Sequence, residues 1–256
     1  MRGPRSASIT SAAGLVVLAS LAGAGEAVPG NPLIAIPGGA FVFGRDDGLE
    51  NEGPAERIEI AAFAINRTEI TNAQYRAFVA ETGHRASFFA DHSELGLPER
   101  PVVGVSWADA EAFCRHYGLA LPSERQFERA ARGRDGALHP WGDGPAATRA
   151  NRGAEACCAP DTADGYAMTA PAASFPRGVS AEGVMDLVGN VWEWTADWYG
   201  PHEVGPGARA ERFKVLRGGA WNSDNQRLTA TYRLAYAPDF RFAGNGGFRC
   251  VDTSLP

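Results

Sequence analysis

The chain has 256 residues, a net charge of −6 and 21% charged residues with both signs scattered along it. No basic face or Lys/Arg-rich amphipathic helix is recognisable, which argues against nucleic-acid binding and against attachment to a membrane surface. Glycine (31) and proline (17) are abundant and aromatics are plentiful, so we expect a loop-rich but packed protein.

The N-terminus has the features of a secretory signal. Two arginines precede an apolar stretch at 12–24, and small residues offer cleavage sites after Ala24 or after Ala27. The stretch is too short for a permanent membrane span, and no later segment approaches the roughly 20 apolar residues required. We therefore expect a signal peptide at 1–27, one domain at 28–256, and a periplasmic or secreted protein. An uncleaved membrane anchor is the alternative.

Patterns in the first half of the chain predict strands followed by three helices. Apolar residues around Pro37-Gly38-Gly39 indicate two strands joined by a turn, and alternation at 58–65 indicates a third. Capping boxes and terminal glycines predict helices from Thr71 to Gly83, from Ser106 to Gly118 and from Ser123 to Gly133. Their expected inward faces are Tyr75, Phe78, Val79 and Thr82, then Ala110, Phe113, Cys114 and Tyr117, then Phe127, Ala130 and Ala131.

Beyond Gly133 the helical signals stop and short glycine- and aromatic-rich segments follow. They are Pro140-Trp141-Gly142-Asp143, Val188-Gly189-Asn190-Val191-Trp192-Glu193-Trp194, Leu216-Arg217-Gly218-Gly219-Ala220-Trp221 and Gly247-Phe248-Arg249-Cys250. The stretch 201–210, rich in glycine and proline without an apolar period, is the expected mobile loop. No linker or repeat divides the chain.

These segments, in this order, resemble the formylglycine-generating enzyme (sulfatase-modifying factor) family. Four earlier stretches match as well: Ile36-Pro37-Gly38-Gly39, Glu69-Ile70-Thr71-Asn72-Ala73-Gln74-Tyr75, Pro101-Val102-Val103-Gly104-Val105-Ser106-Trp107 and Leu121-Pro122-Ser123-Glu124. The resemblance covers nearly the whole mature chain, and eight ordered matches are a specific signal. It implies an irregular, loop-rich α+β fold related to C-type lectins.

The resemblance breaks at the copper site. Classical members oxidise a sulfatase cysteine to formylglycine with O2 and Cu(I), which two cysteine thiolates bind because soft ligands select Cu(I). Alignment from Arg217-Gly218-Gly219 places Ser223 and Leu228 at those two positions, and no cysteine lies between Cys158 and Cys250. We therefore expect no copper.

The four cysteines fall into two pairs. Cys114 and Cys250 match positions that form a structural disulfide in the family, and an exported chain favours such a bond. Two unpaired thiols are the alternative. Adjacent Cys157-Cys158 has no family counterpart, and a strained vicinal disulfide, a metal or redox site and two reduced loop cysteines all remain open.

The resemblance also implies structural calcium, bound by main-chain and side-chain oxygens as a hard cation requires. One site would use Asn151, the Arg152 carbonyl, Asp164 and the Tyr166 carbonyl. A second would use Asp186, the carbonyls of Gly189 and Val191, and Glu193. The alternative is that these acidic residues only cap turns.

Three functions compete. The first is an exported oxidative tailoring or maturation enzyme for a peptide or siderophore precursor, because the family includes a periplasmic pyoverdine-maturation protein that also lacks the cysteine pair. Its pocket would hold Trp192, Trp221, Asn222 and Ser223, with Asp224 as candidate base and Arg227 as a clamp for an anionic substrate group. The second is a non-catalytic lectin-like binding module. The third is formylglycine generation by a different arrangement. The substrate, any redox cofactor and the oligomeric state are left open by the sequence.

Overall fold

The computed structural model describes residues 27–142, 144, 146, 148–154, 158–200, 212–241 and 243–255. Most of the predicted signal peptide, Cys157 and the loop predicted at 201–210 lie outside these ranges. Within them, every helix is too short or too polar to cross a membrane.

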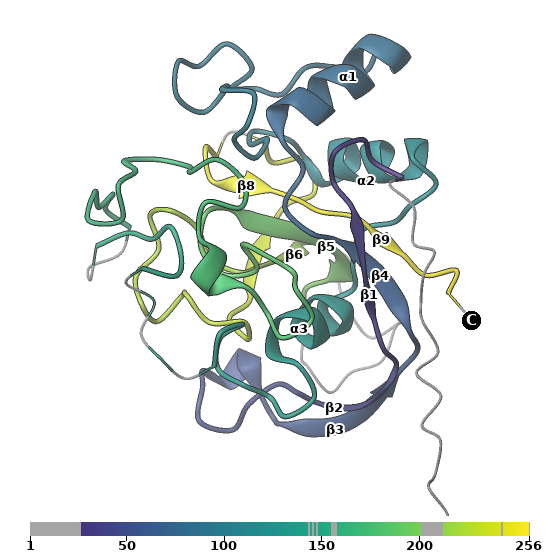
Figure 1. Cartoon of the computed structure of the whole chain (residues 1–256), viewed down its shortest axis with the longest axis vertical. Coiled ribbons are helices and arrows are strands. Elements are labelled where there is room, and N and C mark those ends of the chain that lie inside the picture. Colours follow the sequence, from purple (N-terminus) through teal and green to yellow (C-terminus); the bar gives the residue numbers. More distant parts are fainter. Residues whose placement is uncertain are drawn as a thin grey trace, which may run out of the picture.

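The described residues form an α+β fold of short elements joined by long loops (Figure 1). The helices are α1 (Asn72–Thr82), α2 (Trp107–His116) and α3 (Glu124–Arg132), with 3-10 turns η1 (Glu50–Glu52) and η2 (Pro176–Gly178). The first sheet has the order β1-β4-β9 and consists of β1 (Leu33–Ile36), β4 (Phe63–Asn66) and β9 (Val251–Asp252). A separate pair is formed by β2 (Gly39–Phe43) and β3 (Glu56–Ile60). The order β7-β6-β5-β8 describes the third sheet, with β7 (Leu234–Tyr236), β6 (Lys214–Arg217), β5 (Trp192–Trp198) and β8 (Gly246–Gly247).

The layers follow from this order. Figure 1 shows α1 and α2 at one end of the molecule, the β2–β3 pair at the other, and α3 between that pair and the four-stranded sheet. One apolar core lies between α1, α2 and the four-stranded sheet, and a second lies around α3 and the β1-β4-β9 sheet. The irregular, loop-rich α+β fold expected from the sequence is confirmed.

The three predicted helices are confirmed, with a full capping box at each start. The hydroxyls of Thr71, Ser106 and Ser123 each accept a hydrogen bond from the backbone N–H three residues later, and the side chain at that position bonds back. One predicted inward residue is wrong, because Thr82 is exposed. It lies in the last turn of α1, where its hydroxyl donates to the Phe78 carbonyl at 2.6 Å instead of packing inward.

The two strands predicted on either side of Pro37-Gly38-Gly39 are confirmed as β1 and β2, and they lie in different sheets, since β1 pairs with β4 and β2 with β3. The single strand predicted at 58–65 is wrong, because this run is divided between β3 and β4, which also belong to different sheets. Gly38, between β1 and β2, packs closely against Ala62, between β3 and β4. A Cβ on Gly38 would lie 2.7 Å from the Ala62 nitrogen, so only glycine fits at this point where both segments pass from one sheet to the other. Alternation reveals a strand but not its partner.

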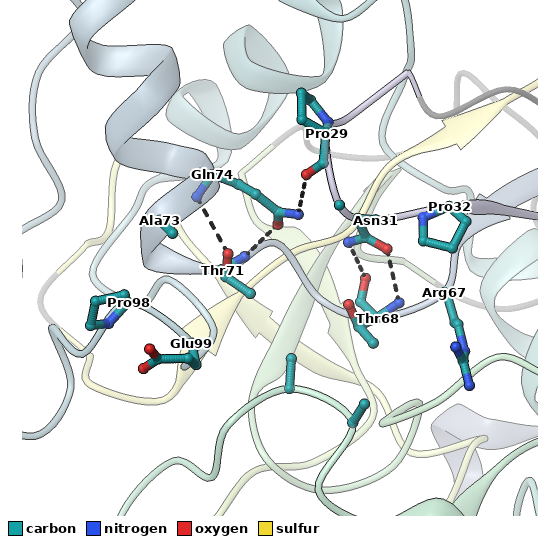
Figure 2. Close-up of a pocket in the computed structure, with 13 residues that line it drawn as sticks. Pro29, Asn31, Pro32, Arg67, Thr68, Thr71, Ala73, Gln74, Pro98 and Glu99 are labelled. Atoms are coloured by element: carbon teal, nitrogen blue, oxygen red, sulfur yellow. Dashed lines mark hydrogen bonds between the residues drawn. The ribbon is translucent and has the colours of Figure 1, made fainter.

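The N-terminal arm is fixed against the start of α1 (Figure 2). Val28 is fully buried, and its carbonyl accepts the Asn31 N–H at 3.1 Å. The Asn31 amide bonds the backbone of Thr68 through both its nitrogen and its oxygen, and Gln74 Nε2 donates to the Pro29 carbonyl at 2.9 Å. The arm therefore belongs to the folded domain and forms one wall of an open groove of about 480 Å³.

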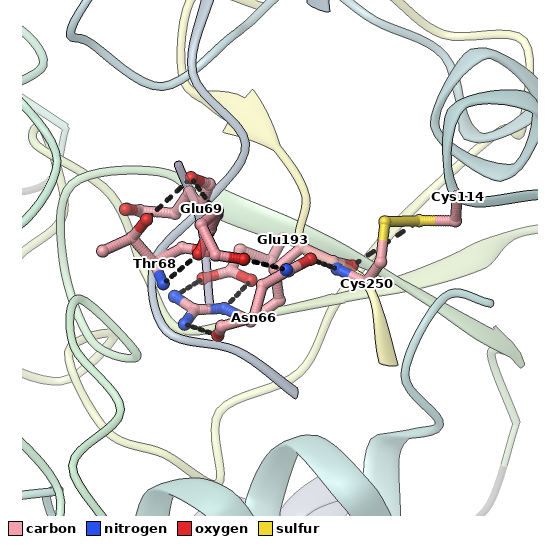
Figure 3. Close-up of a disulfide and its surroundings, with 8 residues drawn as sticks. Asn66, Thr68, Glu69, Cys114, Glu193 and Cys250 are labelled. Atoms are coloured by element: carbon pink, nitrogen blue, oxygen red, sulfur yellow. Dashed lines mark hydrogen bonds and ion pairs between the residues drawn. A yellow bond between two sulfur atoms is a disulfide. The ribbon is translucent and has the colours of Figure 1, made fainter. Parts of the chain in front are cut away.

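The predicted Cys114–Cys250 disulfide is confirmed, with the Cα atoms 5.6 Å apart (Figure 3). It joins α2 to the segment before β9 across a sequence separation of 136 residues. Closing so long a loop stabilises the fold by about 5 kcal/mol on the chain-entropy model. Cys158 is disulfide-bonded as well, so a reduced thiol at this position is excluded.

Candidate functional site

The segment Arg217-Gly218-Gly219 is anchored in the core and positions the loop that follows it. This loop carries Ser223 and Leu228, the residues predicted at the two copper positions. Arg217 at the end of β6 is fully buried and pairs with Glu124 at 2.8 Å and Glu128 at 2.5 Å, both on α3. Gly218 and Gly219 then adopt left-handed φ values of 97° and 79°. A Cβ at these positions would lie 2.9 and 2.8 Å from backbone oxygens, so no other residue fits.

The side chains that replace the thiolates are used for structure. The buried Ser223 hydroxyl accepts the Ala220 N–H at 3.0 Å and closes the turn after the two glycines. Leu228 is fully buried in the α3 core together with Phe127. Neither side chain offers a soft metal ligand.

The structure brings three of the predicted site residues into one row. Asp224 pairs with Arg227 at 2.5 Å, and the Arg227 guanidinium lies 5.7 Å from the centre of the Tyr232 ring. That ring lies 5.6 Å from the ring of Trp192, which is buried. The Arg227 side chain is 31% exposed and that of Asp224 13%, so solvent reaches the charged end of the row. No sequence pattern singled out Tyr232.

The other two predicted pocket residues tie the loop to the segment before β8. Trp221 Nε1 donates to the Gly244 carbonyl at 3.0 Å, and Asn222 Oδ1 accepts the Asn245 amide at 3.0 Å. Both predicted residues are half-buried. The loop is therefore held from two sides.

In the first predicted calcium set, Asp164 contacts the backbone of two of the other predicted residues. Its two carboxylate oxygens accept the backbone N–H groups of Arg152 at 2.8 Å and Tyr166 at 2.9 Å, while burial raises its pKa. The neighbouring Asn151 donates to the Met168 carbonyl at 2.8 Å, but its own Oδ1 is buried without a hydrogen-bond partner. Buried polar atoms normally have a partner, and an amide oxygen is one of the ligand types that calcium takes.

The second predicted set is only partly assembled (Figure 3). Both oxygens of the buried Glu193 bind Arg249, each at 2.7 Å. Asp186 instead accepts the Ala173 N–H at 2.6 Å, and its charge acts on Glu69, which no sequence pattern singled out as a site residue. The other predicted positions, Gly189 and Val191, lie on the segment between Asp186 and Glu193.

Negative charge is in excess at this second set. Burial, and then the charge of Asp186, raise the pKa of Glu69 well above its usual range. One Glu69 oxygen accepts the Asn190 amide at 3.1 Å and the other is buried without a partner. Three buried carboxyl groups thus interact with the buried guanidinium of Arg249, and Asp186 also interacts with Arg67. A proton on Glu69 or a further cation would balance the remaining negative charge. Within the described residues, no cluster of three or more His, Cys, Asp or Glu is placed to bind a metal.

Comparison with known proteins places this geometry in a family. The model of the sulfatase-modifying factor enzyme 1-like domain matches residues 20–254. The chain belongs to the sulfatase-modifying factor family. It is 33% identical to the inactive C-alpha-formylglycine-generating enzyme 2 of Mus musculus, over 87% of this chain and 86% of that protein. It is also 33% identical to the hercynine oxygenase of Mycolicibacterium thermoresistibile, over 83% of this chain and 58% of that protein.

A solved structure has a similar fold. PvdO from Pseudomonas aeruginosa aligns with a TM-score of 0.71 at 25% identity, covering 86% of this chain and 94% of that one. The sulfatase-modifying factor family thus includes oxygenases as well as proteins named inactive, and membership alone does not decide between the two.

Proposed function

We propose that this protein is an exported oxidative tailoring enzyme that acts on a peptide or siderophore precursor at the Asp224–Arg227–Tyr232–Trp192 row. The observation that supports this most is the row itself, which offers one carboxylate, one accessible guanidinium and two aromatic rings where the relatives' copper site would be. The oxygenase among the relatives is consistent with oxidative chemistry. The reaction removes two hydrogens from the substrate, and dioxygen accepts them to give hydrogen peroxide.

The Asp224–Arg227 ion pair suggests how substrate binding would activate such a site. While the two side chains bind each other, the Asp224 carboxylate is occupied by the Arg227 guanidinium and cannot contact a substrate proton. An anionic group of the substrate would compete for the exposed Arg227 and release Asp224 to accept a proton. The rings of Tyr232 and Trp192 would provide the flat surface beside it.

Aerobic turnover tests this proposal. The purified protein is incubated with dihydro-type siderophore precursors and with peptides, and hydrogen peroxide and the loss of two hydrogens in product mass are followed. We expect Asp224→Asn to lower kcat by about a hundredfold, because a positioned base contributes that much or more. Arg227→Gln should mainly raise KM for anionic substrates. No peroxide and no mass change with any precursor would contradict the enzyme.

A non-catalytic binding module is the second candidate. The closed Asp224–Arg227 pair and the 33% identity to a relative named inactive both favour it. The two candidates separate in one experiment: calorimetric binding of a precursor without oxygen consumption supports the module, and oxygen consumption supports the enzyme.

We also propose that calcium is the structural cofactor. The buried, unpartnered oxygens of Asn151 and Glu69 support it at the two sets, because each would be satisfied by an oxygen-ligated cation. For export, the support is the disulfide between Cys114 and Cys250, since such bonds persist in oxidising compartments.

A further inference from the structure

A small, largely enclosed cavity lies behind Trp192 on one face of the four-stranded sheet. Its walls are mostly rings and aliphatic groups, and the main ones are Trp192, Trp194, Leu216, Tyr236 and Phe240. Trp192 and Trp194 are two residues apart on β5, so both side chains point to this face. The volume, about 10 Å³, is at the lower limit for one water-sized molecule.

One cation borders this apolar space. Arg241 lines the cavity and is held from outside by the Ala86 carbonyl, which accepts its Nη2 at 2.7 Å. Its Nε is buried and has no hydrogen-bond partner. Leaving a buried donor unpaired is costly, so a ligand that accepts a hydrogen bond at this atom would be favoured.

The cavity is connected to the candidate site through two shared residues. Trp192 forms a wall of the cavity and contacts Tyr232 of the Asp224–Arg227 row. Asn245 lines the cavity and donates to Asn222 of the pocket loop. The cavity and the proposed substrate position thus share Trp192 as a wall, and Asn245 links the cavity to the pocket loop.

We propose that this cavity binds dioxygen and that Arg241 stabilises the negative charge that develops on it during reduction. This rests on the proposed function, in which a substrate C–H bond and a neighbouring N–H or O–H bond break and a double bond forms between those atoms. Of the four electrons in the two broken bonds, two form the new double bond and two pass to dioxygen. The two protons released from the same bonds complete hydrogen peroxide. Neutral dioxygen suits the apolar walls, whereas its reduced form suits the guanidinium N–H.

A single water molecule is the competing occupant. A buried water normally makes two to four hydrogen bonds, and this cavity is lined mainly by carbon. Dioxygen needs no hydrogen bond to enter. Only the reduced, negatively charged form requires the Arg241 donor. Arg241 would therefore stabilise the reduction of dioxygen and contribute little to the binding of neutral dioxygen.

Dioxygen binding is measured directly by NMR, independently of turnover. Dissolved dioxygen is paramagnetic, so under oxygen pressure we expect faster relaxation of the Leu216 and Val105 methyl protons than of the Ile65 methyls in the other core. Gly246→Ala should abolish the difference. Its added Cβ would lie 3.8 Å from Leu216 Cδ2 with nothing closer, so it fills space without a clash. Equal relaxation at all three residues in the parent protein would overturn the site.

The role of Arg241 is tested by oxygen kinetics on any substrate the protein turns over. Arg241→Gln should lower kcat/KM for dioxygen by at least about tenfold with the substrate KM unchanged, and Arg241→Lys should retain most of it. A Gln variant as fast as the parent would refute the charge-stabilising role. If the parent binds dioxygen in the NMR experiment but oxidises no precursor, the proposed function fails while the cavity assignment stands.

Discussion

At the scale of single residues, the altered copper positions are well integrated into the fold. Ser223 closes a turn through the Ala220 N–H, and Leu228 fills the core beside α3. The same loop still begins with Arg217, Gly218 and Gly219, whose ion pairs and left-handed backbone are independent of copper. The Arg217-Gly218-Gly219 segment is thus held by contacts of its own, and the two residues predicted at the copper positions contribute to the turn and to the core.

We predict that the protein does not convert a sulfatase cysteine peptide to formylglycine, with or without added copper. Ser223 and Leu228 cannot bind Cu(I), and Cys114 and Cys250 are committed to a disulfide. Peptide mass after aerobic incubation checks this. A Cys158→Ser variant, made together with Cys157→Ser, is the necessary control. Formylglycine formed by the parent and lost in this variant would show that the adjacent cysteines supply the chemistry.

At the scale of elements, buried ions at helix starts hold the helices in place. Asp109 in the first turn of α2 accepts hydrogen bonds from Ser106, Arg85 and His84. Burial alone would raise the pKa of Asp109, but these hydrogen bonds, that from Arg85 first, outweigh it and lower the pKa to about 2. The ionised carboxylate therefore ties the loop after α1 to the start of α2.

The lowered pKa of Asp109 predicts a pH-dependent contribution to stability. Its stabilisation is fully present above the ordinary pKa of 3.8 and is lost as the pH falls toward about 2. Asp109→Asn should lower the free energy of unfolding by about 2 kcal/mol at pH 7, and the difference from the parent should shrink below pH 4. Urea unfolding at several pH values measures it. Asp135→Asn, on an exposed turn, is the matched control, and a pH-independent difference for Asp109→Asn would contradict the assignment.

At the scale of the whole molecule, the sequence predicted local structure better than long-range pairing. Capping boxes located the helices, since a cap depends on residues three positions apart. Strand alternation could not assign 58–65 to two sheets, because pairing depends on distant segments. Two of the family motifs carry buried ion pairs between segments that are distant in the sequence: Arg217 binds Glu124 of α3, and Arg249 binds Glu193. Tyr232 has no such motif, so its place in the site was not predictable.

The buried N-terminal arm favours one of the two signal cleavage sites. Val28 is fully buried, so cleavage after Ala27 would place a charged ammonium at a buried nitrogen, which is costly. We therefore predict cleavage after Ala24, and the intact mass of the exported protein measures it. Ala24→Leu should block processing at this site, whereas Ala27→Leu should leave the cut unchanged. A mature chain that starts at Val28 would contradict the prediction.

Calcium should stabilise the whole domain, because the two proposed sets join segments that are distant in the sequence. Asp164 contacts the backbone on both sides of the 152–166 loop, and Glu69 beside α1 meets Asp186 in the loop-rich half. A cation bound only by the folded state raises stability by about 2.7 kcal/mol at a hundred times its Kd. For a domain of this size we expect Tm to rise by about 5 °C or more when a chelator is replaced by millimolar calcium.

Two single substitutions make the calcium experiment specific. Asp164→Asn should reduce the calcium-dependent rise in Tm, because it removes the anionic ligand of the first set. Asp161→Asn is its control: this residue lies on the same loop, where its carboxylate accepts the Ala163 N–H at 3.0 Å and forms a 3.7 Å contact with Arg152, and it is not part of the predicted calcium set. Glu69→Gln should lower the calcium effect of the second set. Without calcium it should cost little, because it removes one of three buried carboxyl groups whose charges repel one another. A Tm that is identical in chelator and in calcium for the parent protein would refute both sites at once.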